Sequence, residues 1–511
     1  MIVEEMIENK ILLLDDMVRK SDSLRREGRV IVQSHGVFDL IHPGMIQHLK
    51  HAKKLGDILV VTVIRDKDVH RGPGRPIFPE QFRAENVASL EMVDYVCIVD
   101  DEAPFECVKA IKPDVFAKGQ AYGDRDKKIH DKIFQEEKDL YFGKCRVIET
   151  EGFSFSSSHI INNFLDIYPE DTKRFLKGFK ERYSFADIAD RINTLKDLKV
   201  LIIGDGIIDE YHYCEPLGKS AKANLVVSKY LSHEVFAGGT FAVGNHTAGL
   251  CEHVQMVSLL GKEAPREDFI LKNVRPNIKT KFFYKDNSPT IVKKRYIHEY
   301  LNQKLFEICY LNDDLVNSEC ESQVIDYLIS EAPKYDLVMV SDFGHGFITK
   351  NMIKALEDYS KILSVNAQTN AANVGYNFIT KYNAPHYVCV DEAELRLSSQ
   401  EKHAPIEDIA KKTAKDINAD SLIVTLGKRG SLGVNHNNTN RTPIFSHKVV
   451  DTVGAGDAFF AFTAPCYAKG MPLDLLSFIG NAVGALAVQI VCNKKPIEKY
   501  ELLEFIHTVL K

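Results

Sequence analysis

Two carboxylates that flank a glycine-rich turn have the most evident chemistry in this sequence, Asp451 and Asp457 of the stretch DTVGAGD. An apolar segment precedes the turn and the apolar run 458–462 follows it, so the turn is expected to join a strand to a helix. Gly454 and Gly456 have no Cβ, so backbone N–H groups can converge there on an anion, and the first helical turn adds its positive dipole end. Asp457 would then stand beside the anion, where a carboxylate can accept the proton of a hydroxyl that attacks a γ-phosphoryl group. The stretch therefore predicts phosphoryl transfer by a kinase.

An ordinary turn with an acidic residue in the first helical turn is the alternative interpretation of this stretch. The spacing of the two aspartates and the apolar helix after them favour the catalytic interpretation. With these features the stretch resembles the signature of the ribokinase-like sugar kinases. The resemblance implies that Asp457 is the catalytic base and that the backbone of Gly454, Ala455 and Gly456 forms the anion hole.

A second glycine turn lies near the other end of the chain, in the stretch HGVFDLIHPGM at 35–45. A strand-like segment at 29–34 precedes it, and apolar residues at helical spacing follow from Ile46 to Leu55. Pro43 suits the first turn of that helix, which places His42 and Gly44 at a helix N-terminus, where phosphates bind. The run 57–64 (DILVVTVI) is apolar after its first residue, as a strand covered on both faces must be. The order of strand, turn, helix and strand predicts a parallel βαβ unit.

This second stretch resembles the nucleotidyltransferase family that includes the glycerol-phosphate cytidylyltransferases and the adenylyltransferase half of the bifunctional heptose-activating enzymes. The family pattern GxFDxxHxGH is matched from Gly36 to Gly44, and the resemblance implies that His42 steadies a triphosphate as pyrophosphate leaves. Met45 stands where the second His of the pattern belongs, and a thioether cannot stabilise that charge. His48 lies one helical turn along, roughly 5 Å away, and is a poor substitute. Retained nucleotide transfer and a nucleotide-binding module without turnover both stay open.

Three later segments of the first half also resemble that family: the basic loop and arginine at 71–83, IKPDVFAKG at 111–119, and the serine-rich helix start at 155–161. Each has a plainer alternative, such as a solvated loop or a simple helix cap. Together they imply an N-terminal nucleotide site made of Gly36, Val37, Phe38, Asp39, His42, Gly44, Arg75, Arg83, Lys118, Ser156 and Ser157.

A strand-like run at 198–203 opens the second half and leads into GDGIID at 204–209. This opening resembles that of the ribokinase-like kinases, whose second aspartate binds sugar hydroxyls, and a carboxylate can accept two such hydrogen bonds. A helix-capping acid is the alternative for Asp209. The cations of KKR at 293–295 either bind phosphate or belong to a solvated edge strand. The resemblance implies a substrate site made of Asp209, Gly238, Gly239, Asn245 and Asp342.

The ATP and Mg²⁺ side of the kinase site is also implied by resemblance. Asp391 and Glu394 stand where the family has Asn-x-x-Glu, which organises Mg²⁺ and its waters. Neutral amides at 366–370 replace the Asp-Pro-Lys usual in heptose-type relatives and indicate a different substrate. A core asparagine is the alternative for Asn481. The residues expected beside ATP and Mg²⁺ are Glu394, Thr425, Gly427 and Asn481, and no metal ligand set is assigned.

Length and composition limit what kind of protein can hold these sites. The 511 residues suggest about two to four domains, and 45% apolar with 27% charged residues is typical of globular proteins. A net charge of -6 gives no indication of a nucleic-acid or membrane surface. The ten cysteines form no CxxC pair and the N-terminus has no signal-peptide layout, so we expect reduced thiols in a cytoplasmic protein.

The sequence therefore predicts an α/β protein with two doubly wound domains: a Rossmann-like nucleotidyltransferase domain of the HxGH type at 1–168, a linker and leading helix at 169–197, and a ribokinase-like domain at 198–511. Both resemble the halves of the bifunctional heptose-activating enzymes, in reversed order along the chain. The resemblance implies a sugar or polyol kinase joined to a sugar-phosphate nucleotidyltransferase that makes a nucleotide-activated sugar. It implies Mg²⁺, ATP for the kinase, CTP or ATP for the N-terminal domain, and a sugar or sugar-phosphate substrate. The alternative is a carbohydrate kinase with an inactive nucleotide-binding module, and the oligomeric state stays open although relatives are commonly dimers.

Overall fold

The computed structural model describes residues 7–69, 75–100, 104–119, 145–150, 168–301, 303–436 and 438–511. The chain forms two compact units. The first holds residues 1–190 together with 503–511, and the second holds residues 191–502.

The first unit contains a sheet of five parallel strands in the order β3-β2-β1-β4-β5. Its strands are β1 (Ile31–Gly36), β2 (Ile58–Ile64), β3 (Tyr95–Val99), β4 (Val115–Gly119) and β5 (Arg146–Thr150). The sequence is apolar through β2 because that strand is covered on both faces. The strand order reverses direction at β1, with β2 on one side and β4 on the other, and ligands of open α/β sheets bind beyond such a point.

Four helices pack against this sheet: α2 (Leu14–Arg26), α3 (Pro43–Lys53), α4 (Glu80–Ala88) and α5 (Phe105–Ile111). Two further helices follow in the chain, α8 (Glu170–Lys180) and α9 (Phe185–Asn193). Helix α3 begins as the sequence predicts, with His42 as its N-cap and Pro43 in its first turn. Leu49 and Ala52 of α3 are fully buried in the core under the sheet.

A larger sheet organises the second unit. Its main part runs β9-β8-β6-β12-β13-β14-β15-β16-β17, parallel from β9 to β15 and antiparallel at the β16 and β17 edge. These strands are β8 (His253–Gly261), β9 (Ile278–Lys285), β12 (Leu337–Asp342), β13 (Leu363–Ala367), β14 (Tyr387–Asp391), β15 (Ser421–Thr425), β16 (Ser431–Asn435) and β17 (Thr439–Thr442).

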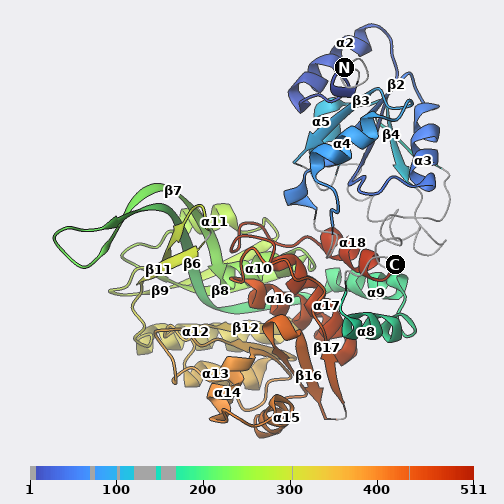
Figure 1. Cartoon of the computed structure of the whole chain (residues 1–511). Coiled ribbons are helices and arrows are strands. Elements are labelled where there is room, and N and C mark those ends of the chain that lie inside the picture. The colour runs from blue at the N-terminus through green and yellow to red at the C-terminus, as the bar shows by residue number, and fades with distance from the viewer. Residues whose placement is uncertain are drawn as a thin grey trace. The chain divides into compact units, whose positions relative to one another are not determined.

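Strand β6 (Lys199–Lys219) continues out of the main sheet into a smaller one. Its residues 199–205 pair with β8 and β12, whereas residues further along pair with β7 (Val226–Gly239) and β10 (Ile291–His298). β11 (Gln303–Tyr310) completes the smaller sheet by pairing with β10. In Figure 1 the far ends of β6 and β7 form a long green ribbon that extends from the second unit.

Two layers of helices cover the main sheet of the second unit (Figure 1). The helices are α10 (Thr240–Ala248), α11 (Glu267–Asn273), α12 (Ser318–Glu331), α13 (Lys350–Tyr359), α14 (Glu392–Ser399), α15 (Ile406–Asp416), α16 (Ala455–Ala468) and α17 (Leu473–Ala487). The last helix, α18 (Lys499–Val509), belongs from residue 503 onward to the first unit. Helices α12 to α15 share one core with alternate strand residues such as Leu201 and Ile203, while α10, α16 and α17 pack on the opposite face.

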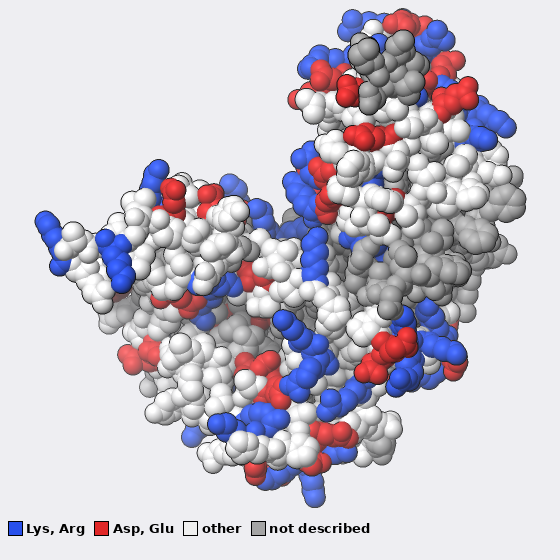
Figure 2. Space-filling view, viewed as in Figure 1, with Lys and Arg blue, Asp and Glu red and all other residues white. Residues whose placement is uncertain are grey.

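These observations confirm the expected fold class, a Rossmann-like α/β unit followed by a doubly wound α/β unit. All ten cysteines are free thiols, and nine of them are buried. Within the described ranges no helix is both long and apolar enough to cross a bilayer. Acidic and basic side chains are interspersed over the face of the second unit seen in Figure 2.

Candidate active site

A cavity of about 900 Å³ lies in the second unit where the glycine turn meets the ends of the central strands. Its wall includes the start of α16, the ends of β14 and β15, and side chains from β6 and β10. The cavity is large enough for a nucleotide and a sugar-sized acceptor to bind side by side.

The glycine turn leads directly into α16, but the strand expected before it does not form. After β17 ends at Thr442, residues 443–450 are irregular, and Val449 and Val450 are exposed rather than covered by a core as a buried strand would be.

Gly454 is the N-cap of α16 and has a φ of +85°, a left-handed conformation that favours glycine. A Cβ at Gly454 would overlap Oδ1 of Asn493, whereas Gly456 has open space where its Cβ would be. The first N–H groups of a helix have no partner within the helix. In α16 the N–H of Ala455 donates to Thr452 O at 3.3 Å, and those of Gly456 and Asp457 are available to an anion in the cavity.

Asp451 holds this turn in place. Its carboxylate accepts hydrogen bonds from Tyr211 Oη at 2.7 Å, Lys304 Nζ at 2.6 Å, and the backbone N–H groups of Val453 and Cys492 at 3.1 Å each. Burial favours the neutral acid, but these donors outweigh it and lower the pKa of Asp451. The ionised Asp451 is therefore an anchor for the turn.

Asp457 lies at the wall of the cavity with 7% of its surface exposed. Gln368 Nε2 donates a hydrogen bond to Asp457 Oδ1 at 2.6 Å. Burial raises the pKa of Asp457 to about 6, while the hydrogen bond from Gln368 opposes the shift. A carboxylate in this range is ionised at neutral pH and retains affinity for a proton, as a general base requires.

Asp209 reaches the same cavity from β6 and pairs with Arg295 of β10. Arg295 also donates from Nε to Glu307 at 2.7 Å, so its charge is shared between two carboxylates. A Cβ at Gly238 would overlap the Asp209 carboxylate, which explains the glycine there. Gly239 lines the cavity and has a φ of +56°.

Glu394 also lines the cavity, from the first turn of α14. Its oxygens accept from Thr369 N at 3.0 Å and Asp391 N at 2.8 Å, the latter as part of a capping box on α14. Burial raises the pKa of Glu394 to about 7, with the backbone hydrogen bonds opposing it. Mg²⁺ binds through one or two carboxylates, waters and substrate phosphates, and Glu394 fits that chemistry.

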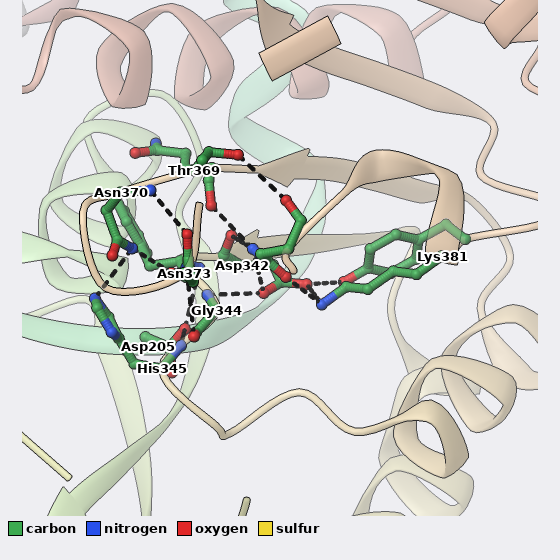
Figure 3. Close-up of polar contacts among 12 residues, drawn as sticks. Asp205, Asp342, Gly344, His345, Thr369, Asn370, Asn373 and Lys381 are labelled. Carbon is green, nitrogen blue, oxygen red and sulfur yellow. Dashed lines mark hydrogen bonds and ion pairs between the residues drawn. The ribbon is translucent and has the colours of Figure 1, made fainter. Parts of the chain in front are cut away.

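Of the other residues predicted for the site in the second unit, some line the cavity and some do not. Thr425, Gly427 and Asn481 line the cavity, and the Asn481 amide donates to Ser431 Oγ at 2.6 Å and to Ser477 O at 2.7 Å. Asn245 and Asp342 lie outside the lining. The Asn245 amide bonds to the backbone of Asn273 and Arg275, and Asp342 binds Tyr382 Oη at 2.6 Å and Lys381 Nζ at 2.5 Å (Figure 3).

Sequence reasoning did not assign Gln368, Lys293 or Asn493 to this site, although all three line the cavity. Lys293 lies in the cationic stretch that the sequence left open, and residues 293 and 295 share a face of β10. Gln368 lies in the neutral-amide segment that departs from the heptose-type pattern, and that departure was the available signal.

In the first unit, His42 caps α3, and its Nδ1 accepts from Met45 N at 3.4 Å. Burial lowers the pKa of His42. Asp39 is 4% exposed and accepts from the N–H groups of Ile77 at 2.8 Å and Phe78 at 3.0 Å, so it fixes the segment after β2. Phe38 is buried in the core with a φ of +52°, Gly36 ends β1, and Gly44 is buried in α3.

Arg83 is completely buried, and its guanidinium donates to Val37 O, to Phe78 O at 2.9 Å, to Ile64 O at 2.7 Å and to Asp66 Oδ1 at 2.6 Å. To bind a phosphate, the Arg83 guanidinium would have to break some of these internal hydrogen bonds. Arg75 is 8% exposed and Lys118 lies at the end of β4. Ser156, Ser157 and the loop residues 71–74 lie outside the described residues.

Met45 occupies the position of the second histidine in the family pattern, and His48 lies about one turn further along α3. Met45 is half-buried and packs against the core of the first unit. His48 Nε2 lies 2.7 Å from Ser34 Oγ, and its Nδ1 bonds to Thr150 Oγ1. Thr150 uses its own proton on Lys118 O, so Nδ1 donates to Thr150 and Nε2 accepts from Ser34. Burial lowers the pKa of His48 to about 4, so this neutral ring is committed to structure.

Two family models match the chain. Residues 199–492 match the pfkB family carbohydrate kinase model, and residues 34–163 match the cytidylyltransferase-like model.

Curated relatives match over part of the chain. A bifunctional protein HldE from Syntrophotalea carbinolica is 32% identical over 177 residues, which are 33% of this chain and 35% of that protein. The bifunctional protein HldE of a Nitratiruptor species is 44% identical over 108 residues, or 21% of this chain and 23% of that protein. The matches thus span about a third or less of the length of these relatives.

Solved structures share the fold of the second unit. Phosphofructokinase-2 from Escherichia coli, in its tetrameric inhibited form, superposes with a TM-score of 0.50 at 14% identity over 61% of this chain and 100% of that one. The same enzyme in complex with substrates and products gives a TM-score of 0.51 at 13% identity, with the same coverage.

Proposed function

This chain belongs to the pfkB family of carbohydrate kinases, and from that premise we propose that its second unit transfers the γ-phosphoryl group of ATP to a hydroxyl of a sugar or polyol. The observation that carries the proposal is Asp457, a buried carboxylate at the wall of a cavity of about 900 Å³ and in the first turn of α16.

In the proposed reaction, Asp457 accepts the proton of the acceptor hydroxyl as its oxygen attacks the γ-phosphorus. The backbone N–H groups of the turn at 454–456 and the positive end of α16 stabilise charge that develops on the phosphoryl oxygens. Asp209, fixed by Arg295, binds acceptor hydroxyls, and Gly239 lets the backbone approach the sugar. Mg²⁺, when bound through Glu394 and neighbouring phosphates, would neutralise charge on the triphosphate.

We further propose that the first unit transfers a nucleotide to a sugar phosphate, from CTP or ATP. Its cytidylyltransferase-like match and the position of His42 at the start of α3 support this role. The chain would then make a nucleotide-activated sugar in the cytoplasm, with its two activities in the reverse order of the heptose-activating enzymes. We retain the division into 1–168, 169–197 and 198–511 as the proposed functional domains.

The test screens sugars, polyols and their phosphates against ATP and CTP, with ADP and pyrophosphate followed separately. Asp457→Asn should lower ADP formation by about 10²-fold or more, because the general base is lost. Asp326→Asn, an exposed position on α12, serves as the matched control and should leave turnover unchanged. Unaltered turnover in Asp457→Asn would refute the assignment of the base.

A further inference from the structure

The end of β13 and the loop after it carry five amides: Asn366 in the strand, and Gln368, Asn370, Asn373 and Asn377 in the loop. Sequence reasoning interpreted the amides at 366–370 only as a departure from the heptose-type pattern. In the structure they form a connected network, and Figure 3 shows Asn370 and Asn373 of this loop beside the group around Asp342 and Lys381. The network ends on Asp457, the proposed base.

Hydrogen bonds to its N–H and its carbonyl fix the backbone of Gln368. Its N–H donates to Asp342 O at 2.8 Å, and its carbonyl accepts from Asn377 Nδ2 at 2.9 Å. Asn377 also donates to the Asp342 carboxylate at 3.2 Å and accepts from Lys381 Nζ at 2.6 Å. Asp342 is 1% exposed and is itself paired with Lys381. Asp342 therefore anchors the residue that touches the base, even though it does not line the cavity.

The orientation of the Gln368 side chain follows from its neighbours. Asn366 Nδ2 donates to Cys389 O at 2.8 Å, which turns Asn366 Oδ1 toward Gln368. Gln368 Nε2 then donates one hydrogen to Asn366 Oδ1 at 2.8 Å and the other to Asp457 Oδ1 at 2.6 Å. The flipped amide would place Oε1 against two acceptor oxygens, which is unfavourable. Both Nε2 hydrogens are thus used, and the bond to Asp457 is charge-assisted.

The other oxygen of Asp457 is left for the substrate. Among the described residues no hydrogen-bond donor is placed on Asp457 Oδ2, while the residue as a whole is 7% exposed and lines the cavity. A carboxylate held through one oxygen cannot rotate freely, so the lone pairs of the second oxygen keep one direction.

We propose that Gln368 is a positioning residue for phosphoryl transfer: its amide fixes the Asp457 carboxylate through Oδ1 and directs Oδ2 toward the acceptor hydroxyl. The proposal rests on the kinase function proposed above. A donor on the carboxylate also stabilises the ionised form, so Gln368 keeps the base ready at neutral pH. The other charged or titratable groups around Asp457 are Asp209 of β6, Lys293 of β10, Cys389 of β14 and Glu394 of α14.

Titration of Asp457 in the full chain, without substrates, tests this directly. The protein is labelled with aspartate carrying ¹³C at its carboxyl carbon, and the resonance lost in Asp457→Asn identifies the group. In wild type the midpoint should lie near the raised pKa of about 6. Gln368→Met keeps the side-chain length and removes the donor, so the midpoint should rise by about one pH unit. Gln323→Met, an exposed position on α12, is the matched control and should titrate as wild type does.

Gln368→Glu provides a second variant of nearly identical shape. Two carboxylates at hydrogen-bond distance must share a proton, so the midpoint should rise further than in Gln368→Met. An Asp457 midpoint that stays at its wild-type value in both variants would overturn the proposal.

The kinetic measurement separates this inference from the proposed function. In Gln368→Met we expect kcat for ADP formation to fall roughly tenfold at neutral pH, with KM values within about threefold of wild type. In a plot of kcat against pH, the acid limb, where activity falls as Asp457 is protonated, should move to higher pH. Wild-type protein that phosphorylates no acceptor would refute the kinase function, whereas the titration would still decide the role of Gln368. An unchanged acid limb in an active Gln368→Met enzyme would contradict the positioning role.

Discussion

Two aspartates that flank one turn have opposite roles because their surroundings differ. Asp451 accepts four hydrogen bonds, including one from the Lys304 ammonium, and its pKa is lowered. Asp457 accepts one from a neutral amide, and burial raises its pKa to about 6. The first is suited to hold the turn and the second to accept a proton, although the residue type is the same.

At the same scale, Met45 stands where the family pattern has its second histidine, and the proposed nucleotide transfer by the first unit should depend on it. We expect Met45→His to increase pyrophosphate release by at least roughly tenfold over wild type with a sugar-phosphate acceptor, since an imidazole can stabilise the departing charge. His48 cannot supply this effect while both of its nitrogens bond to Ser34 and Thr150. The measurement is coupled-enzyme detection of pyrophosphate.

Met92→His is the matched control for that substitution, because Met92 also packs against the core of the first unit. Both variants should lose some stability from the lost packing, but only Met45→His should gain activity. Equal pyrophosphate release in wild type and Met45→His would mean that the position does not limit the reaction.

At the scale of elements, the kinase site depends on how the irregular segment after β17 turns into α16. Gly454 is required for its backbone conformation and for the space that Asn493 fills, whereas Gly456 faces open space. The fold therefore requires glycine at position 454, and we expect the glycine at position 456 to leave room for a ligand in the cavity.

Alanine at each position should separate these roles. Gly454→Ala should lower the free energy of unfolding by about 1–3 kcal/mol, because an L-residue is strained there and its Cβ overlaps Asn493. Gly456→Ala should melt close to wild type but bind ATP more weakly, since its methyl group would enter the cavity. Thermal melts and ATP titrations measure the two effects. Equal melting temperatures for the two variants would contradict the strain argument.

At the scale of the whole molecule, each unit has its own sheet and core. The residues proposed for each reaction lie within one unit, so we expect the two activities to be lost independently. His42→Ala should reduce pyrophosphate release by about tenfold or more and leave ADP formation unchanged, while Asp457→Asn should do the reverse. Both products are measured on the same preparations, and joint loss in either variant would indicate that the activities are coupled.

The sequence by itself determined the two α/β folds and the residues whose chemistry is local to one turn. The stretch from Asp451 to Asp457 and the helix start at His42 could be predicted because their neighbours in the chain set their backbone geometry and helix dipole. Apolar runs such as β2 likewise indicated buried parallel strands.

Only the tertiary structure decided which side chains meet. Gln368 contacts Asp457 across 89 positions of sequence, and Arg295 pairs with Asp209 across 86, distances at which no periodic pattern extends. Arg83 illustrates the converse, because its residue type suggests a phosphate contact while the fold surrounds it with internal acceptors. The turn places Asp457 in the cavity, but contacts with residues far away in the sequence set its orientation and its pKa. Those contacts depend on how strands and helices pack, so the sequence alone did not reveal them.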